Sequence, residues 1–371
     1  MTKARYQVSF LPWFRLEKSV EVGPIVFWPY YKEREERIED EKIMKHLNGL
    51  MQCYVDHRGN PVNTITICSH TSVDLRPLNE QEMLDIRNAV DALVFTSIAP
   101  QVKNAVCANN RSWGPPSADI FQLVIQNFEP GHPSIAVRAG SRLDAGWKIG
   151  EITFPEPWAK GGFTIGRDDE LLAALSECFN KEFRDRIFRS LEWFRMAHIE
   201  GGGYEVLTRV VMMATAFEIL LNLPVDGKRK KFKKYMEKNV NHEGMQLSVR
   251  SNNKGRHFTG SLAEWWAWDF YELRNRIVHG DRVQGNDLSY SGWITHLIVA
   301  DLLFRQCIVH EMYKEGIFKE EIKKRADDWR KAVQGDVENN HGASSNELEK
   351  MILRSKFDFE KVHKALGWLA Q

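Results

Sequence analysis

The stretch Ser261 to Asp281, S-L-A-E-W-W-A-W-D-F-Y-E-L-R-N-R-I-V-H-G-D, decides how this chain is organised. Its spacing predicts one helix with a signal at each end. Ser261 and Glu264 have the spacing of a capping box, and Gly280 supplies a stop one residue after His279. We therefore expect a helix over residues 262–279.

Three faces of this helix follow from the rotation of about 100° between successive residues. The narrow apolar face is a core stripe made of Trp266, Phe270, Leu273 and Ile277. Glu272 and Arg276 are four residues apart on a second arc, which predicts a surface ion pair. A third arc mixes aromatic and polar side chains, as interfaces do, and it contains Glu264, Trp268, Tyr271, Asn275 and His279. Arg274 lies between the core stripe and this third arc.

The length and composition are those of a globular protein with two domains. The chain has 371 residues, of which 43% are hydrophobic and 27% charged, and its net charge is +1. Two domains of this size can each bury a core. The small net charge excludes a global field for nucleic acid or membrane, so that any such signal must be local.

Cysteine usage and hydropathy predict a cytoplasmic protein without a membrane segment. The five cysteines are scattered and never form a C-x-x-C pair, which favours a reducing compartment and disfavours a disulfide framework or a zinc site. The N-terminus lacks the apolar region of a signal peptide. The most apolar run, Val206 to Leu223, is interrupted by charged residues and is typical of a buried helix.

The first 160 residues predict an α+β domain. Short runs rich in Val, Phe, Trp and Tyr, separated by Pro and Gly, indicate strands within residues 5–30. A helical pattern follows at 33–54, an alternating strand at 62–69 and a long helix at 79–107. Further strands are expected at 119–128, 133–139 and 147–154. The segment P-E-P-W-A-K-G-G at 155–162 is the expected boundary.

The rest of the chain predicts an all-helical bundle over residues 168–334 and a C-terminal helix or arm over 345–371. Expected helices lie near 168–181, 182–199, 204–222, 228–239, 262–279, 288–315, 317–334 and 345–369. The polar segment 239–260 is expected to be a loop, and we find no strand pattern in this half.

The residues Arg274, Asn275 and His279 form a candidate catalytic set at the end of the 262–279 helix. The spacing alone carries little information, because Arg305 and His310 show it as well. The second pair lies inside an apolar helix and is typical of packing positions. The first pair lies off the core stripe, directly before Gly280.

This context carries a resemblance. The segment Y-E-L-R-N-R-I-V-H-G at 271–280 resembles the signature of HEPN domains, in particular those of ApeA-like anti-phage proteins. The helices R-S-L-E-W-F-R-M-A-H at 189–198 and V-V-M-M-A-T-A-F-E-I-L-L at 210–221 fit the same pattern, so that the similarity covers about residues 170–315. It implies a helical bundle that is often a dimeric, metal-independent endoribonuclease and sometimes an inactive binding or antitoxin-type module.

The chemistry of these residue types suits RNA cleavage without a metal or cofactor. The reaction needs a base for the ribose 2′-hydroxyl and an acid for the leaving 5′-oxygen, and histidine titrates in the right range for both. Arg274 would hold the scissile phosphate with its planar fork. Asn275 would orient His279 or bind substrate. One chain supplies one histidine, so we expect a homodimer through the 262–279 helix.

Glu218 is the lone acid in the apolar helix around 210–221. A buried carboxylate needs a partner, and we expect Arg274 or Arg276 to supply it. The alternative is that Glu218 lies on a thin exposed strip. Tyr271 is expected to support the site from the arc that it shares with Asn275.

A basic segment precedes the site. Residues 228–238, K-R-K-K-F-K-K-Y-M-E-K, hold seven basic residues and one acid. The segment is either a phosphate-binding patch or a solvated helix that turns Phe232, Tyr235 and Met236 to the core and its lysines outward. The RNA-binding candidates are Lys230, Lys231, Lys234, Lys254 and Arg256. Base stacking by Trp268 is a further option.

Two functions from different classes remain open. The first is an endoribonuclease in anti-phage defence or toxin-like growth arrest, in which the N-terminal domain is the sensor, regulator or oligomerisation module and a regulatory protein or a phage-derived trigger is a further partner. The second is a non-catalytic HEPN-fold interaction or regulatory protein, in which Arg274 and His279 are structural.

Overall fold

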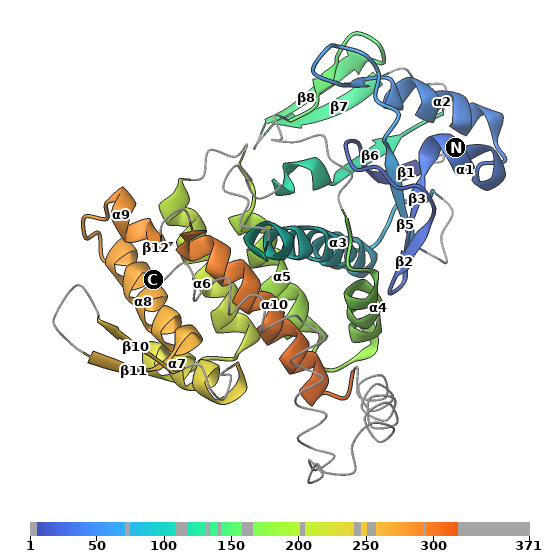
Figure 1. The fold of residues 1–371 in the computed structure, drawn as a ribbon. Coiled ribbons are helices and arrows are strands. Elements are labelled where there is room, and N and C mark those ends of the chain that lie inside the picture. The colour runs from blue at the N-terminus through green and yellow to red at the C-terminus, as the bar shows by residue number, and fades with distance from the viewer. Residues whose placement is uncertain are drawn as a thin grey trace. The chain divides into compact units, whose positions relative to one another are not determined.

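The computed structural model describes residues 6–70, 75–107, 117–130, 132, 134–139, 142–157, 166–200, 205–240, 246–250, 257–291 and 294–317. An antiparallel sheet with helices occupies residues 6–128, and a largely helical region follows over 169–314, which confirms the predicted order of the two architectures (Figure 1). The chain divides into two compact units. The first comprises residues 1–98, 116–184 and 198–204, and the second comprises 99–115, 185–197 and 205–371.

The first unit is built on a five-stranded antiparallel sheet with the order β2-β3-β5-β1-β6. Its strands are β1 (Tyr6–Leu11), β2 (Val20–Val22), β3 (Ile25–Pro29), β5 (Thr66–His70) and β6 (Val124–Phe128). Every residue of β3 is buried, so this strand is covered on both faces. The helices α1 (Tyr30–Arg37) and α2 (Glu41–Met51) follow β3 and share a core with β1, β3 and β5.

Two N-terminal caps explain where helices of this unit begin. Asp40 precedes α2, and its carboxylate accepts the backbone N–H groups of Lys42 and Ile43. Asn79 precedes α3 (Glu80–Cys107) and exchanges two hydrogen bonds of 2.8 and 2.9 Å with Glu82, which is a complete capping box. The helix predicted at 79–107 is thereby confirmed.

Smaller elements complete the first unit. They are β4 (Tyr54–Val55), which pairs in parallel with β9 (Phe154–Pro155), the hairpin β7 (Ser134–Ala139) and β8 (Arg142–Lys148), helix α4 (Asp169–Glu177), and the 3-10 turns Ala118–Phe121 and Cys178–Asn180. The strand predicted at 119–128 begins only at Val124, because a 3-10 turn capped by Ser117 occupies its start.

The division between the units does not fall at the expected boundary of 155–162, since α4 belongs to the first unit. The reason is a contact with the β2–β3 turn: the Gly23 N–H donates to Ser176 Oγ at 2.6 Å. Residues 158–162 of this expected boundary lie outside the described part of the chain.

Within the described residues, the second unit is built mainly on the helices α5 (Arg184–Ala197), α6 (Val206–Leu220), α7 (Lys228–Asn239), α8 (Leu262–Val278) and α10 (His296–Lys314). Phe217 of α6 lies at the centre of their core. Its ring is 5.0 Å from Phe232, 5.8 Å from Trp266 and 5.2 Å from Phe304 between centroids. Each such aromatic pair stabilises by about 0.5–1.5 kcal/mol beyond its burial.

Two short hairpins contradict the prediction that this half contains no strand. The first is β10 (Gln246–Arg250) with β11 (His257–Ser261), inside the segment 239–260 that was expected to be a loop. The second is β12 (Ser289–Ser291) with β13 (Ile294–Thr295), after the short helix α9 (Gly285–Leu288). The helix expected at 288–315 therefore begins at His296, where Thr295 caps it. The helices predicted at 317–334 and 345–369 lie outside the described residues.

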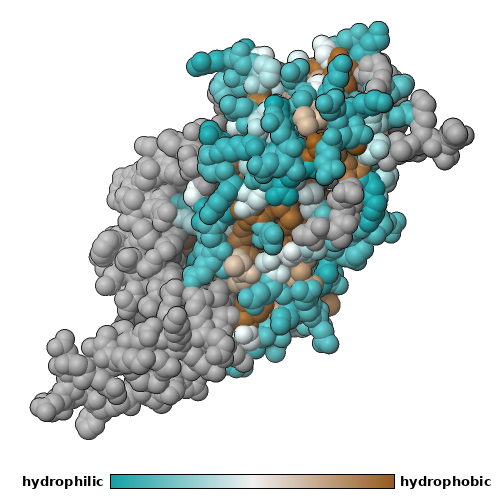
Figure 2. All heavy atoms as spheres, turned by 90° about the vertical axis from the view of Figure 1, so that its right-hand side faces the viewer, coloured by the Kyte–Doolittle hydropathy of each residue, from teal (hydrophilic) through white to brown (hydrophobic). Residues whose placement is uncertain are grey.

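Figure 2 shows one face of the molecule, on which hydrophilic side chains form most of the described surface and hydrophobic ones form separate patches. The large hydrophobic side chains that are exposed in the described ranges come from four separate segments and are Leu84, Val206, Val225 and Val278. Single exposed apolar side chains are normal on soluble domains, but Val278 lies beside His279.

Candidate functional site

The C-terminal end of α8 has the geometry that the sequence predicts. The helix ends at Val278, and Gly280 follows with a φ of +77°. The Gly280 N–H donates to the Ile277 carbonyl at 3.1 Å, and the Asp281 N–H donates to the Arg276 carbonyl at 2.9 Å. These two bonds are the Schellman motif, which satisfies the last carbonyls of a helix. Gly280 is thus confirmed as the stop signal.

The start of α8 agrees in position with the prediction, because the helix begins at Leu262, directly after Ser261. The Ser261 side chain lies outside the described part of the chain, so the capping box stays a prediction. The core stripe is confirmed for Trp266, Phe270 and Leu273, which are buried, whereas Ile277 near the helix end is half-buried.

Helix α7 covers most of the third arc of α8, which the sequence marked as an interface. Lys233 of α7 pairs with the buried Glu264 at 3.4 Å. The guanidinium of Arg229 lies 3.9 Å above the ring of Trp268. Tyr271 is buried as well. The part of the arc around Glu264, Trp268 and Tyr271 is therefore an interface with α7 of the same chain. Base stacking on the Trp268 face that Arg229 covers is excluded in this arrangement.

The ion pair expected between Glu272 and Arg276 is also wrong. Arg276 instead binds Asp287 through both terminal nitrogens at 3.1 Å each, and Glu272 pairs with Arg229 of α7. The hydrogen bond from Arg276 lowers the pKa of Asp287. A tertiary fork-to-carboxylate pair offers two parallel bonds, which the i,i+4 pair on one helix does not.

Glu218 of α6 is the centre of a polar cluster that it forms with Tyr271 and Arg274 of α8 and Lys228 of α7. Its side chain is 12% exposed, and Arg274 Nη2 lies 3.4 Å from its Oε1. The predicted pairing with Arg274 is confirmed. The Tyr271 hydroxyl donates to the same oxygen at 2.6 Å, and the Lys228 ammonium binds Oε2. Burial and the hydrogen bond to Glu218 raise the pKa of Tyr271, so the phenol stays protonated and donates.

The guanidinium of Arg274 is held but not saturated. Its Nη1 donates to Asn275 Oδ1 at 3.2 Å, and its plane lies 5.5 Å from the centre of the Tyr271 ring. The distance of 3.4 Å to Glu218 is longer than a normal hydrogen bond. The Nε atom is enclosed and has no hydrogen-bond partner. Arg274 is therefore oriented by its neighbours, and its hydrogen-bonding capacity is not fully used.

His279 is exposed one turn beyond Asn275, and its backbone N–H donates to the Asn275 carbonyl at 2.9 Å. Five residues correspond to a rotation of about 140° on a helix, so Arg274 and His279 leave α8 in different directions. The structure accordingly brings Arg274, Asn275, Tyr271 and Glu218 into one cluster. It places His279 at the rim, outside that network.

The basic helix α7 turns apolar side chains to the core and lysines to solvent, which both interpretations of its sequence allow. Phe232 and Met236 are buried, as expected for a solvated helix that turns its apolar side to the core. Lys230, Lys231 and Lys234 are exposed, as an RNA-binding face requires. The candidates Lys254 and Arg256 lie outside the described residues.

Sequence reasoning missed Lys228 as a member of the site. The signal was present, since the first turn of α7 carries four basic residues and no acid, an arrangement that opposes the helix dipole. Compensating carboxylates must come from elsewhere, and they do: Glu218 of α6 reaches Lys228, and Glu272 of α8 reaches Arg229.

The second Arg–His pair occupies packing positions, as expected. Arg305 is buried, and burial lowers the pKa of His310 to about 4. A neutral and enclosed imidazole cannot take part in proton transfer with an external substrate.

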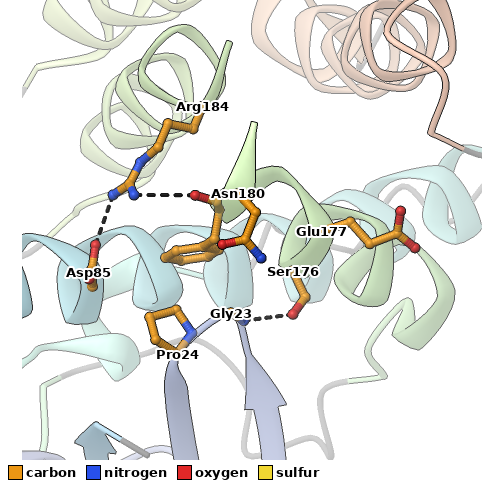
Figure 3. A pocket seen from close by; sticks show the side chains of 8 residues that line it. Gly23, Pro24, Asp85, Ser176, Glu177, Asn180 and Arg184 are labelled. Atoms are coloured by element: carbon orange, nitrogen blue, oxygen red, sulfur yellow. Dashed lines mark hydrogen bonds and ion pairs between the residues drawn. The ribbon is translucent and has the colours of Figure 1, made fainter. Parts of the chain in front are cut away.

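A pocket of about 540 Å³ lies in the first unit, between the β2–β3 turn, α3 and the junction of α4 and α5 (Figure 3). Arg184 donates to Asp85 Oδ1 at 2.8 Å and to the Phe179 carbonyl at 3.2 Å. The polar groups that line the pocket largely bind one another, so we interpret the pocket as a structural junction. Gly23 is required there, because a Cβ atom at this position would lie 2.4 Å from the Phe179 ring.

Within the ranges that the structure describes, no group of three or more His, Cys, Asp or Glu side chains is placed to hold a metal ion. None of the described helices is long and apolar enough to cross a bilayer.

Comparison of the chain with protein-family models, with curated proteins and with solved structures gives no match. The resemblance to HEPN domains therefore depends on the residues quoted above, and it enters the functional argument as a hypothesis.

Proposed function

We propose that the chain is an endoribonuclease that cleaves RNA without a metal, at a composite site made by the C-terminal turns of α8 from two copies. Anti-phage defence or toxin-like growth arrest is the setting that the resemblance implies. The observation that carries the proposal is the oriented but unsaturated Arg274 at the same helix end as the exposed His279.

The need for two copies follows from geometry. Arg274 is directed toward Glu218, whereas His279 leaves the helix about 140° away. One chain therefore offers a phosphate-binding cation and a single proton carrier that do not share a contact. Val278 is exposed and lies between Arg274 and His279 in the sequence. A two-fold axis beside Val278 would bring His279 of each copy toward Arg274 of the other.

The proposed reaction uses each group once. One His279 removes the proton of the ribose 2′-hydroxyl, and the 2′-oxygen attacks the phosphorus. His279 of the second copy, protonated, gives its proton to the leaving 5′-oxygen. Arg274 neutralises charge that develops on the phosphorane oxygens. The products are a 2′,3′-cyclic phosphate and a 5′-hydroxyl end.

The test is incubation of purified wild type and His279→Ala with total RNA in the presence of EDTA. Wild type should produce cyclic-phosphate ends and His279→Ala should produce none, with unchanged circular dichroism. His57→Ala is the matched control, because His57 is an exposed histidine of the first unit. Cleavage by His279→Ala at the wild-type rate would remove the proposal.

The alternative is a non-catalytic interaction or regulatory protein of the same fold. It is favoured by one observation, the pairing of Arg274 with Glu218 of its own chain, which gives Arg274 a structural role. A purified protein that binds no RNA and stays monomeric would support this alternative.

A further inference from the structure

The contacts of Glu218 point to a residue of the site that its sequence motif does not contain. The carboxylate accepts from Tyr271 at 2.6 Å, lies 3.4 Å from Arg274 Nη2, and binds the Lys228 ammonium. We propose that Lys228 binds a backbone phosphate of the RNA beside the one held by Arg274, and that this phosphate replaces Glu218 on Lys228. This assignment rests on the proposed function in its choice of RNA as the ligand.

Charge is the first argument. The ammonium of Lys228 and the guanidinium of Arg274 share a single carboxylate, so the cluster keeps one net positive charge. This excess positive charge attracts phosphodiester groups to the cluster of the free chain. The Tyr271 phenol adds a neutral donor, whose pKa is raised by burial, and does not change this balance.

Access is the second argument. The side chain of Lys228 is 26% exposed, whereas that of Glu218 is 12% exposed and lies on the inner side. Lys228 opens the same helix whose residues Lys230 and Lys231 are exposed, and no ion pair of these two occurs among the described residues. An RNA strand that binds these exposed lysines of α7 can therefore reach Lys228 from solvent without displacing any helix.

The unsatisfied Nε atom of Arg274 is the third argument. This Nε atom is enclosed without a hydrogen-bond partner, and a buried donor in that state destabilises the fold. Glu218 binds Lys228 through its Oε2 and makes no hydrogen bond to this Nε. Once a phosphate takes Lys228, the freed carboxylate oxygen can accept from Arg274 Nε. Exchange of partners therefore removes an unsatisfied donor and also tightens the orientation of Arg274.

The experiment measures binding in the full chain with His279→Ala, which prevents cleavage. A labelled single-stranded RNA is titrated over a range of salt concentrations. Lys228→Gln should lower affinity about tenfold at low salt and reduce the salt slope by about 0.7, the value for one phosphate on a single strand. Lys228→Arg should restore the slope.

The matched control is Lys238→Gln, at the exposed far end of α7, about 15 Å along the helix axis. It should leave the slope unchanged. Glu218→Gln should bind RNA more tightly than its parent, because it lacks the carboxylate charge that competes with the phosphate for Lys228. If Glu218 has only a structural role, Glu218→Gln should bind RNA as tightly as its parent or more weakly. This variant therefore gives a second readout.

The outcomes separate the two proposals. Equal affinity and slope for Lys228→Gln and Lys238→Gln overturns the assignment of Lys228, and so does an absence of RNA binding in every variant. If the wild-type chain binds RNA through Lys228 but does not cleave it, this assignment holds and the proposed nuclease is lost.

Discussion

Replacement of Glu311 by glutamine tests whether the basic helix α7 is held in place by buried charge. The Glu311 carboxylate of α10 is 6% exposed, and it accepts from Arg186 of α5 at 2.6 Å and from Tyr235 of α7 at 2.8 Å. Lys314, one turn further along α10, donates to it at 2.6 Å. Three helices thus meet at one carboxylate, on the unit that carries the candidate site.

The magnitude follows from these contacts. Removal of one partner of a buried ion pair costs about 3–5 kcal/mol, because the remaining charge is left without compensation. Here the cost is smaller, since the glutamine oxygen still accepts one bond and Arg186 keeps its bonds to the Leu220 carbonyl and to Glu315. We expect Glu311→Gln to lose about 2–4 kcal/mol of unfolding free energy. Glu315→Gln is the control: its side chain is 42% exposed and 3.4 Å from Arg186, so we expect a loss below about 0.5 kcal/mol.

The direction of the Glu311 pKa shift predicts how the stability difference between wild type and Glu311→Gln changes with pH. Burial alone would raise the pKa of Glu311, but the donors Lys314, Arg186 and Tyr235 outweigh it, and the net shift is downward. A carboxyl with a lowered pKa stabilises the fold fully above its unfolded pKa of about 4.3. This contribution is lost as the pH falls through the folded pKa. The difference between wild type and Glu311→Gln should therefore be largest near neutral pH and shrink in acid.

Urea unfolding followed by circular dichroism measures the loss, and hydrogen exchange of peptides from α7 and α10 locates it. If Glu311→Gln and Glu315→Gln shift the midpoint equally, or if the difference does not change with pH, the buried carboxylate does not hold these helices. The reasoning about α7 would then be wrong.

Three further substitutions test other parts of the structure. Gly23→Ala should cost more than about 2 kcal/mol in urea unfolding, because φ is +58° and the new Cβ meets the Phe179 ring at 2.4 Å. Gly280→Ala should cost only about 1 kcal/mol, since φ is +77° but nothing lies within 4 Å; equal losses at both sites would refute the steric argument. Val278→Cys, on the exposed end of α8, should form an intermolecular disulfide under mild oxidation if two copies meet there, whereas Leu84→Cys, equally exposed in the first unit, should not.

Local signals explain why the ends and the core face of α8 could be predicted. The stop at Gly280 depends on a left-handed backbone conformation that glycine adopts without strain, and the structure shows it. The core stripe depends only on helix geometry. The hairpin β10–β11 was missed although Gln246–Arg250 alternates polar and apolar residues, because its polar composition outweighed its period in the prediction.

The partners of side chains could be predicted only where few candidates existed. Glu218 is the single acid of an apolar helix, so its need for a cation was evident, and Arg274 was one of two named choices. Arg276 had an acid one turn away and also a distant one, and the distant Asp287 is its partner in the structure. Nothing local could indicate that α7 would cover the arc through Glu264.

The cluster at Glu218 connects the stability of the second unit with its proposed use of RNA. In the free chain the carboxylate pairs with two half-buried cations and neutralises one of their two charges, which stabilises the junction of α6, α7 and α8. A bound phosphate would do the same for Lys228. A variant such as Glu218→Gln should then be less stable without RNA and gain more stability from RNA than its parent, since a ligand that binds only the folded state stabilises it in proportion to its affinity. A residue with a purely structural role changes the first quantity and leaves the second alone.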